Sequence, residues 1–255
     1  MPPFASYPSL SGRTVFVSGG GSGIGASIVE HFAEQGAKVG FVDIDEAASK
    51  ALVEKIEARR FAVPMFVPCD IRDVASYQRA IEGVAAKLGT ITVLVNNAAR
   101  DDRHTLAQVT PDFWDERIAV NLRHAYFAIQ TVAPAMKKAG GGSIVNFSSV
   151  SYHTMTPNLS VYQAAKAAVI GMTRGLARDL GGDGIRLNAV TPGWIMTQRQ
   201  LDLWVTPEAK AAQLGAQCLK ELLYPPDIAR MVLWLAADDS RMVTAQNFVV
   251  DGGRM

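Results

Sequence analysis

The sequence contains few cysteines and no pattern that binds a metal. Among its 255 residues only Cys69 and Cys218 are cysteines. Cys69 follows an apolar run and Cys218 lies among Ala, Gln and Leu, so we expect two buried free thiols and a reducing compartment. His, Cys and acidic residues do not occur at the spacings of a metal site. The sequence therefore predicts neither a disulfide-stabilised domain nor a metalloprotein.

The chain also lacks an excess of charge and a long apolar segment. Its formal net charge is +1, which creates no long-range field that would attract nucleic acid or an anionic membrane. No apolar run approaches the ~18 residues of a membrane span. The first eight residues lack the basic stretch and apolar core of a signal peptide, and their prolines indicate a loose arm. We expect a cytoplasmic protein that binds a small molecule, with no nucleic-acid or membrane partner.

The chain does have a regular alternation of short apolar strands and helices. Such an alternation predicts a parallel sheet covered by helices on both faces, a doubly wound α/β fold of about seven strands. At this length we expect one domain spanning residues 1–255. The predicted strands are 14–18, 38–42, 63–67, 91–95, 143–147, 185–190 and 247–250, and the main predicted helices are 46–60, 74–88, 112–138, 161–179 and 226–236.

One long segment interrupts this alternation. More than thirty residues separate Pro192 from Pro225, and they include Trp194 and Trp204. An excursion of this length in a compact domain is usually functional, and it follows the carboxyl end of a strand, where open α/β sheets place their ligands. We predict a substrate lid over about 193–224; a pair of helices at a subunit interface is the alternative.

A glycine-rich turn joins the first strand to the first helix. It reads Gly19-Gly20-Gly21-Ser22-Gly23-Ile24-Gly25. Such a turn lets the backbone approach a pyrophosphate at the helix N-terminus, and its context predicts a Rossmann-type dinucleotide site. Asp43 ends the second strand, where a carboxylate can accept hydrogen bonds from the adenosine ribose and repel a 2′-phosphate. NAD is therefore favoured over NADP, although a turn that only closes a strand–helix unit is an alternative.

Tyr162 and Lys166 are the candidate catalytic pair. Their spacing of four places the phenol and the ammonium on one helical face. Lowering a phenol pKa from about 10 to about 7 takes ~4 kcal/mol, and an ammonium at ~5 Å supplies about 3 kcal/mol of it. A cationic nicotinamide nearby could add the rest. The pair therefore predicts a tyrosine general base, whereas an ordinary helix-surface pair is the alternative.

Seven motifs in order resemble those of the short-chain dehydrogenase/reductase family over essentially the whole chain. Ser18 and Ala99 depart from the family, which usually has Thr and Gly there. The motifs are Ser18-Gly19-x-x-x-Gly23-Ile24-Gly25, Cys69-Asp70-Ile71, Asn96-Asn97-Ala98-Ala99, Asn121, Asn146-Phe147-Ser148-Ser149, Tyr162-x-x-x-Lys166 and Pro192-Gly193.

The resemblance implies a catalytic tetrad of Asn121, Ser149, Tyr162 and Lys166. Ser149 is preferred to Ser148 because family members place the serine thirteen residues before the tyrosine. Asn121 is expected to help hold a water that relays the proton. The resemblance also implies a homotetramer. The implied cofactor-binding residues are Gly19, Ser22, Gly23, Ile24, Gly25, Asp43, Asp70, Ile71, Asn97, Ala98, Tyr162, Lys166, Pro192, Gly193, Ile195 and Thr197.

A narrower set of segments is similar to the bacterial NAD-dependent D-xylose 1-dehydrogenases of this family. They include Asp101-Asp102-Arg103-His104, Asn121-Leu122-Arg123-His124 and Ala216-Gln217-Cys218-Leu219-Lys220. This likeness implies oxidation of a cyclic aldose at C1 to the lactone. Besides Ser149, the expected hydroxyl partners are His153, Asn158, Gln198 and, with less support, His104.

Two other functions stay open at this point. One is oxidation or reduction of another secondary alcohol, a steroid or a hydroxyacyl group, for which a lid rich in aliphatic side chains would be expected. The other is a catalytically silent NAD-binding scaffold, which an intact tetrad disfavours. The mixed polar composition of residues 193–224 favours the sugar.

Overall fold

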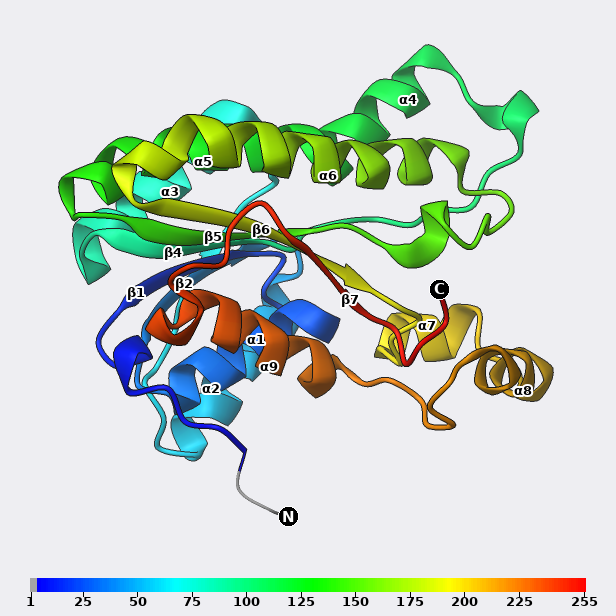
Figure 1. Ribbon diagram of the computed structural model, residues 1–255, viewed down its shortest axis with the longest axis horizontal. Helices are drawn as coiled ribbons and strands as arrows, with labels where there is room; N and C mark the ends of the chain where they lie inside the picture. The colour runs from blue at the N-terminus through cyan, green and yellow to red at the C-terminus, as the bar shows by residue number, and fades with distance from the viewer. Residues whose placement is uncertain (1–3) are drawn as a thin grey trace.

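A computed structural model describes residues 4–255 as one α/β domain built on a single seven-stranded sheet (Figure 1). Every strand pair is parallel, in the order β3-β2-β1-β4-β5-β6-β7. The predicted doubly wound fold is confirmed. The strands are β1 (Thr14–Ser18), β2 (Lys38–Asp43), β3 (Met65–Pro68), β4 (Ile91–Asn96), β5 (Gly142–Phe147), β6 (Ile185–Pro192) and β7 (Asn247–Val250).

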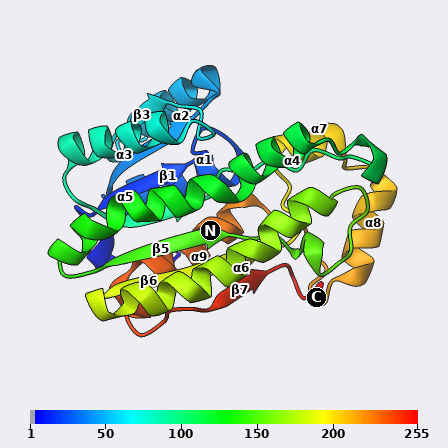
Figure 2. The same ribbon diagram turned by 90° about the horizontal axis from the view of Figure 1, so that it is seen from above.

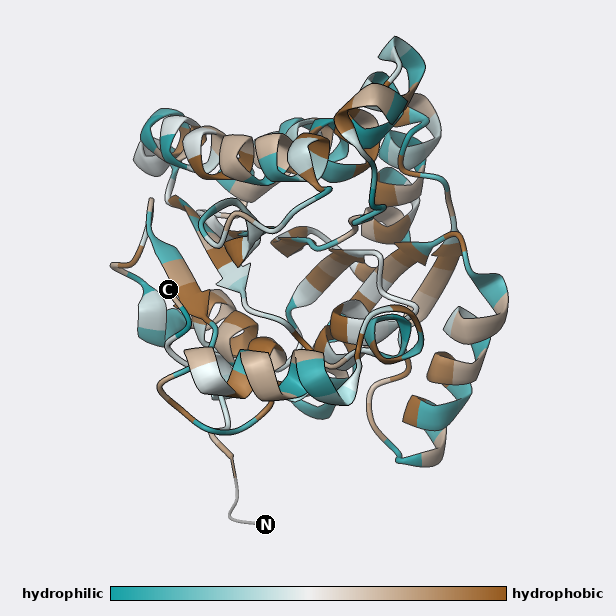
Figure 3. Ribbon diagram, turned by 90° about the vertical axis from the view of Figure 1, so that its right-hand side faces the viewer, coloured by the Kyte–Doolittle hydropathy of each residue, from teal (hydrophilic) through white to brown (hydrophobic). Residues whose placement is uncertain are grey.

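Helices cover both faces of the sheet, and each layer closes its own core. On one face lie α1 (Gly23–Glu34), α2 (Glu46–Ala58) and α9 (Pro225–Ala236); on the other lie α3 (Val74–Leu88), α5 (His124–Lys138) and α6 (Ser160–Leu180). All five residues of β1 are buried, as expected for a strand covered on both sides. Figure 3 shows the hydrophobic strands between the two helix layers.

The chain between β4 and α5 differs from its prediction. A single helix was expected over 112–138, but the structure has α4 (Pro111–Ile118), a π-helical segment (Ala119–Arg123) and then α5. Inside this π-helix, the Asn121 side chain donates to the carbonyls of Arg100 and Arg117 at 3.1 and 2.9 Å. Single-turn π segments widen a helix locally and occur often at functional sites.

Residues 193–224 form an excursion beyond the carboxyl ends of the strands. They contain α7 (Gln198–Leu203) and α8 (Pro207–Ala216), which lie past one end of the sheet while α5 and α6 run side by side over it (Figure 2). The chain returns by pairing Ile195 with Leu223 in an isolated parallel bridge. This arrangement places α7 next to the carboxyl edge, where the ligand of an open sheet binds.

Two minor expectations are corrected. Cys69 is half-buried and Cys218 is exposed, because Cys218 lies in the irregular chain after α8 rather than in the core. The loose arm expected over residues 1–8 is wrong at its end, because Pro8 begins a 3₁₀ turn (Pro8–Leu10) that buries Leu10 completely; residues 1–3 lie outside the described chain. Along residues 4–255, no helix combines the length and the apolar character that crossing a membrane requires.

Candidate active site

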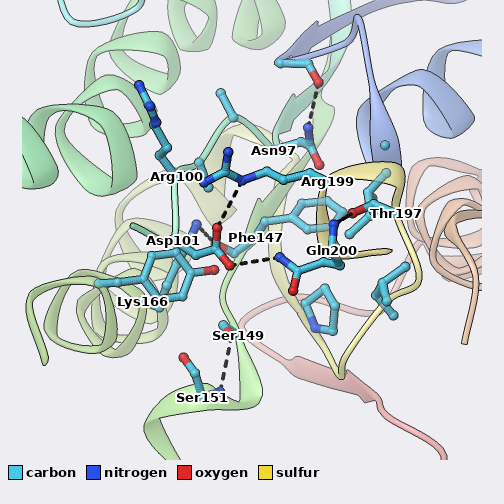
Figure 4. A pocket seen from close by; sticks show the side chains of 18 of the residues that line it. Asn97, Arg100, Asp101, Phe147, Ser149, Ser151, Lys166, Thr197, Arg199 and Gln200 are labelled. Atoms are coloured by element: carbon cyan, nitrogen blue, oxygen red, sulfur yellow. Dashed lines mark hydrogen bonds and ion pairs between the residues drawn. The ribbon is translucent and has the colours of Figure 1, made fainter. Parts of the chain in front are cut away.

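A cleft of about 950 Å³ opens at the carboxyl edge of the sheet. It lies where the strand order reverses between β1 and β4, the position at which doubly wound sheets bind ligands. Asp43, Asp70 and Ile71 line one end, and Ser149, Tyr162 and Lys166 line the other. All sixteen predicted cofactor residues line this cleft. Several side chains at the Ser149 and Lys166 end are drawn in Figure 4.

The glycine turn forms one wall of the cleft, and its backbone tolerates no larger residue at two positions. Gly19 has φ +67°, and a Cβ there would come within 2.8 Å of the Ala98 Cα. A Cβ on Gly25 would meet the Gly19 carbonyl oxygen at 1.8 Å. Helix α1 therefore begins close against the end of β1, and its first N–H groups are available to an anion. This arrangement fits the pyrophosphate of a dinucleotide.

The turn is also held to the strand on its other side. The Ser18 hydroxyl accepts hydrogen bonds from the N–H groups of Asn97 and Ala98, both at 3.2 Å. The Asn97 side chain donates to the carbonyls of Ser18 and Gly19 at 3.1 and 2.9 Å. Ser18 thus keeps the function of the hydroxyl that the family usually places on threonine. These bonds fix the floor of the cleft across β1 and β4.

The end of the cleft predicted to hold the adenosine is acidic. One Asp43 oxygen accepts from the N–H of Gly21 at 2.8 Å and the other accepts from the N–H of Asp45 at 3.0 Å, so the carboxylate is fixed at the cleft wall. Arg72 also lines this end, but its guanidinium pairs with Asp70 at 2.6 Å and with Glu116 at 2.5 Å. The Arg72 hydrogen bonds hold the pKa of Asp70 below its usual value. Arg72 is therefore already neutralised by two carboxylates.

Tyr162 and Lys166 do lie together, but the expected lowering of the phenol pKa is wrong. Burial raises the pKa of Tyr162 above its ordinary value and the charge of Asp101 raises it further, while the nearby Ser149 hydroxyl acts in the opposite direction. The Lys166 ammonium lies 5.7 Å from the centre of the tyrosine ring and donates to the Phe147 carbonyl at 2.8 Å.

The expected attraction between the two groups also required a fully charged Lys166. Its side chain is only 2% exposed, and burial lowers the pKa of Lys166 to about 7. An ammonium that is partly neutral near pH 7 exerts much less attraction on a phenolate than a solvated one. Desolvation of both groups, which residue spacing does not report, is the physical reason for the difference.

Of the two remaining residues of the predicted tetrad, one lines the cleft and the other is buried behind it. Ser149 lines the cleft, and its hydroxyl accepts from the Ser151 N–H at 3.2 Å. The Ser148 hydroxyl donates to the Lys166 carbonyl at 2.7 Å and so fixes helix α6. Asn121 does not line the cleft; its side chain is 1% exposed and also accepts from the Arg100 N–H at 2.9 Å. Its expected role with a water stays a prediction.

Of the predicted hydroxyl partners besides Ser149, the structure places two in the cleft and two outside it. Asn158 and Gln198 line the cleft. His153 does not line it: the ring is exposed and packs on Tyr152, with centroids 4.0 Å apart. His104 is buried and its ring lies 3.2 Å from the Ser160 hydroxyl, so it supports the start of α6 rather than a ligand. Both histidine expectations came from chain position alone, which does not fix the direction of a loop side chain.

The sequence singled out several polar and aromatic residues beyond Tyr162, such as Asp101 and Trp204, but gave them no role at the site. Asp101 follows β4 and accepts hydrogen bonds from the lid residues Arg199 and Gln200 (Figure 4). Its place two residues after the Asn96-Asn97-Ala98-Ala99 motif was the signal that could have identified it. The group that lines this end of the cleft comprises Asp101, Arg103, Trp194, Arg199, Gln200, Trp204 and Arg254.

Comparison with known proteins is consistent with this geometry. A family model described as Enoyl-(Acyl carrier protein) reductase matches residues 19–254. The chain is 50% identical to "Probable galactose dehydrogenase GalD" of Rhizobium meliloti, with 98% of each chain covered. It is 48% identical to "D-xylose 1-dehydrogenase" of Caulobacter vibrioides, again with 98% of each covered.

Solved structures of other proteins are also similar to this chain. A 7α-hydroxysteroid dehydrogenase complexed with NADH aligns with a TM-score of 0.91 at 30% identity, covering 97% of this chain and 96% of that one. A blue fluorescent protein from a metagenomic library, in complex with NADPH, aligns with a TM-score of 0.88 at 35% identity, covering 96% and 99%. With its parallel sheet, glycine turn and Tyr162–Lys166 pair, the chain belongs to the short-chain dehydrogenase/reductase family of oxidoreductases.

Proposed function

We propose that this protein is an NAD-dependent aldose 1-dehydrogenase that oxidises a cyclic sugar, such as D-xylose, at C1 to the lactone. The observation that carries the proposal is the polar lining of the cleft beyond Tyr162. Asp101, Asn158, Gln198 and Gln200 all present hydrogen-bonding groups there. An apolar substrate would displace water from the positions on these groups that the protein leaves without a partner, which costs free energy. A polyhydroxylated substrate satisfies them.

The relatives support the same substrate class. Both proteins with about half their residues identical to this chain are named as dehydrogenases of a sugar, one of galactose and one of D-xylose. The two tryptophans at the lid end, Trp194 and Trp204, supply flat apolar surfaces that suit the faces of a sugar ring. These features favour an aldose over the steroid or hydroxyacyl alternative.

The acidic adenosine end favours NAD. The Asp43 carboxylate would accept hydrogen bonds from the ribose hydroxyls, and it would repel the extra phosphate of NADP. Arg72 does not reverse this preference, because Asp70 and Glu116 already pair with it. A bound NAD would have its pyrophosphate at the start of α1, between Gly19 and Gly25, and would supply the acceptor for the C1 hydride.

The chain's own residues would handle the proton. Ser149 would hold the reacting hydroxyl oxygen, and Tyr162 would accept the hydroxyl proton. Lys166 would hold the nicotinamide ribose, and its position below the tyrosine ring favours the phenolate when the lysine is charged. Asn121 fixes the loop that carries Arg100 and Asp101, and thereby the wall that faces Tyr162.

The proposal predicts both the substrate and the cofactor in one assay. Pentoses, hexoses and simple secondary alcohols are supplied with NAD⁺ or NADP⁺, and nucleotide reduction is followed by absorbance. We expect turnover of at least one aldose. Its kcat/KM should be about 10- to 100-fold higher with NAD⁺ than with NADP⁺, because the Asp43 carboxylate repels the 2′-phosphate of NADP⁺. Activity confined to a steroid or acyl substrate would contradict the sugar, and a preference for NADP⁺ would contradict the role of Asp43.

We further propose that residues 193–224 act as a lid and that the protein is a homotetramer. A groove between α5 and α6, lined by Tyr126, Ile129, Ala133, Leu176 and Leu180, offers apolar surface for a second copy. Multi-angle light scattering should therefore give the mass of four chains. A scattering mass of one chain would rule out the tetramer.

A further inference from the structure

Asp101 is a charged side chain in the cleft that the proposed mechanism leaves without a task. It lies in the loop after β4, two residues beyond Ala99, and its side chain is 21% exposed. A carboxylate seldom stays this enclosed without partners, because removing it from water is costly. Its surroundings therefore indicate what it binds.

Two lid residues hold the carboxylate in one orientation. Arg199 Nε donates to Oδ1 at 3.4 Å, and Gln200 Nε2 donates to Oδ2 at 2.9 Å. Figure 4 shows Asp101 between these two side chains. A carboxylate has about four lone-pair sites and accepts only, so acceptor positions remain on both oxygens. The structure thus presents a fixed acceptor at the wall of the cleft.

This acceptor lies close to the reacting centre. Asp101 lines the same cleft as Ser149 and Tyr162. The Asp101 charge also raises the pKa of Tyr162, second only to burial, which agrees with this placement. A cyclic substrate whose reacting hydroxyl meets Tyr162 and Ser149 would carry its neighbouring ring hydroxyls past Asp101. Hydroxyl donors of a sugar are what a carboxylate acceptor binds.

We propose that Asp101 accepts a hydrogen bond from a ring hydroxyl of the sugar other than the reacting one, and so selects neutral polyhydroxylated substrates. This inference rests on the proposed function. An apolar alcohol would bury the carboxylate against carbon, and an anionic substrate would meet its charge. Asp101 also pairs with Arg199, one of the cations at this end of the cleft that would attract a carboxylated substrate.

The competing explanation is that Asp101 only anchors the lid. Asp102 provides the matched control, because it pairs with the same Arg199 at 3.0 Å but does not line the cleft. Asp102→Asn weakens the anchor, together with the Asp102 pairs to Arg100 and Arg117, and leaves the acceptor in place. Asp101→Leu removes the acceptor, and Asp101→Asn keeps one carbonyl oxygen while removing the charge.

The test pairs each variant with single hydroxyl deletions in the substrate. We measure kcat/KM with NAD⁺ for D-xylose and its 2-deoxy, 3-deoxy and 4-deoxy analogues, and circular dichroism melts verify folding. Asp101→Leu should lower kcat/KM for D-xylose about 10- to 100-fold, the contribution of a charged hydrogen bond. For one deoxy analogue Asp101→Leu should lower kcat/KM less than about threefold, because that analogue already lacks the hydroxyl that Asp101 binds. Asp101→Asn should lie between.

The loss of kcat/KM on D-xylose, compared with the loss on each deoxy analogue, separates the possible outcomes. Any effect of the Asp101 charge on Tyr162 is common to the four sugars and cancels in the comparison. Equal losses on all four sugars, or the same selective pattern in Asp102→Asn, would overturn the inference while the sugar activity stands. If the unmodified protein turns over none of the four sugars, the aldose substrate and the role of Asp101 are both overturned.

Discussion

Replacement of Tyr162 by phenylalanine should lower kcat for sugar oxidation by about 10²- to 10⁴-fold, the usual contribution of a positioned acid or base. Phenylalanine keeps the ring that lies 5.7 Å from Lys166 and removes only the oxygen. The pyrophosphate and adenosine contacts are made elsewhere in the cleft, so NADH affinity should change by less than about threefold. Stopped-flow turnover and fluorescence titration of NADH give the two quantities separately.

The neighbouring Tyr152→Phe variant is the control for this experiment. Tyr152 stacks on His153 and does not line the cleft, so its loss should leave kcat within about threefold of the unmodified protein. The pH profile adds a second readout. Burial and Asp101 raise the pKa of Tyr162, so oxidation should speed up as pH rises into the alkaline range. A Tyr162→Phe protein with an unchanged kcat would refute the assigned base.

Replacement of Lys166 by methionine should stabilise the folded protein while abolishing turnover. The pKa of Lys166 is about 7 in the folded chain against 10.5 for an ordinary lysine. Between these values the unfolded chain binds more protons, so the unmodified protein gains stability as pH rises. Below about pH 7 the folded state holds the buried charge in full. The free energy of unfolding of Lys166→Met, relative to the unmodified protein, should therefore be highest in acid.

The size of this effect follows from the pKa difference. Between about pH 6 and pH 9 the advantage of Lys166→Met should shrink by about 2–3 kcal/mol. Loss of the hydrogen bond to the Phe147 carbonyl lowers the stability of the variant by about 1–3 kcal/mol at every pH and leaves the slope unchanged. Urea melts without added nucleotide at four pH values measure the difference.

An exposed lysine gives the matched comparison. Lys50 pairs with Glu46 on the surface of α2, with 64% of its side chain exposed. Lys50→Met should change stability by less than about 1 kcal/mol, with no trend over the same pH range. His124 is also buried, and burial lowers its pKa to about 3, with a smaller contribution from the Lys166 charge. Burial is the larger cause and is common to all three proteins, so His124 should stay neutral between pH 6 and pH 9. If the difference in unfolding free energy between Lys166→Met and the unmodified protein does not change with pH, Lys166 is charged in the folded protein over this whole range.

The elements of the fold were predictable because their signals are local. Each strand is a short apolar run, and the predicted helix 74–88 is found as α3 (Val74–Leu88). The break within 112–138 was not predictable, since the π-helix follows from bonds between Asn121 and a loop about twenty residues earlier in the chain. His153 was misplaced for a similar reason: the direction of a loop side chain depends on packing that no sequence window contains.

The sequence by itself determined the order of strands and helices, the glycine turn, the acid at the end of β2 and the spacing of Tyr162 and Lys166. Periodicity, backbone freedom and helical geometry are properties of neighbouring residues. Only the tertiary structure decided the electrostatics of the cleft. It buried Lys166 and thereby lowered its pKa to about 7, and it paired Asp101 with Arg199 in the cleft that Tyr162 also lines. Desolvation and charge contact arise between segments far apart in the chain, and only folding brings those segments together.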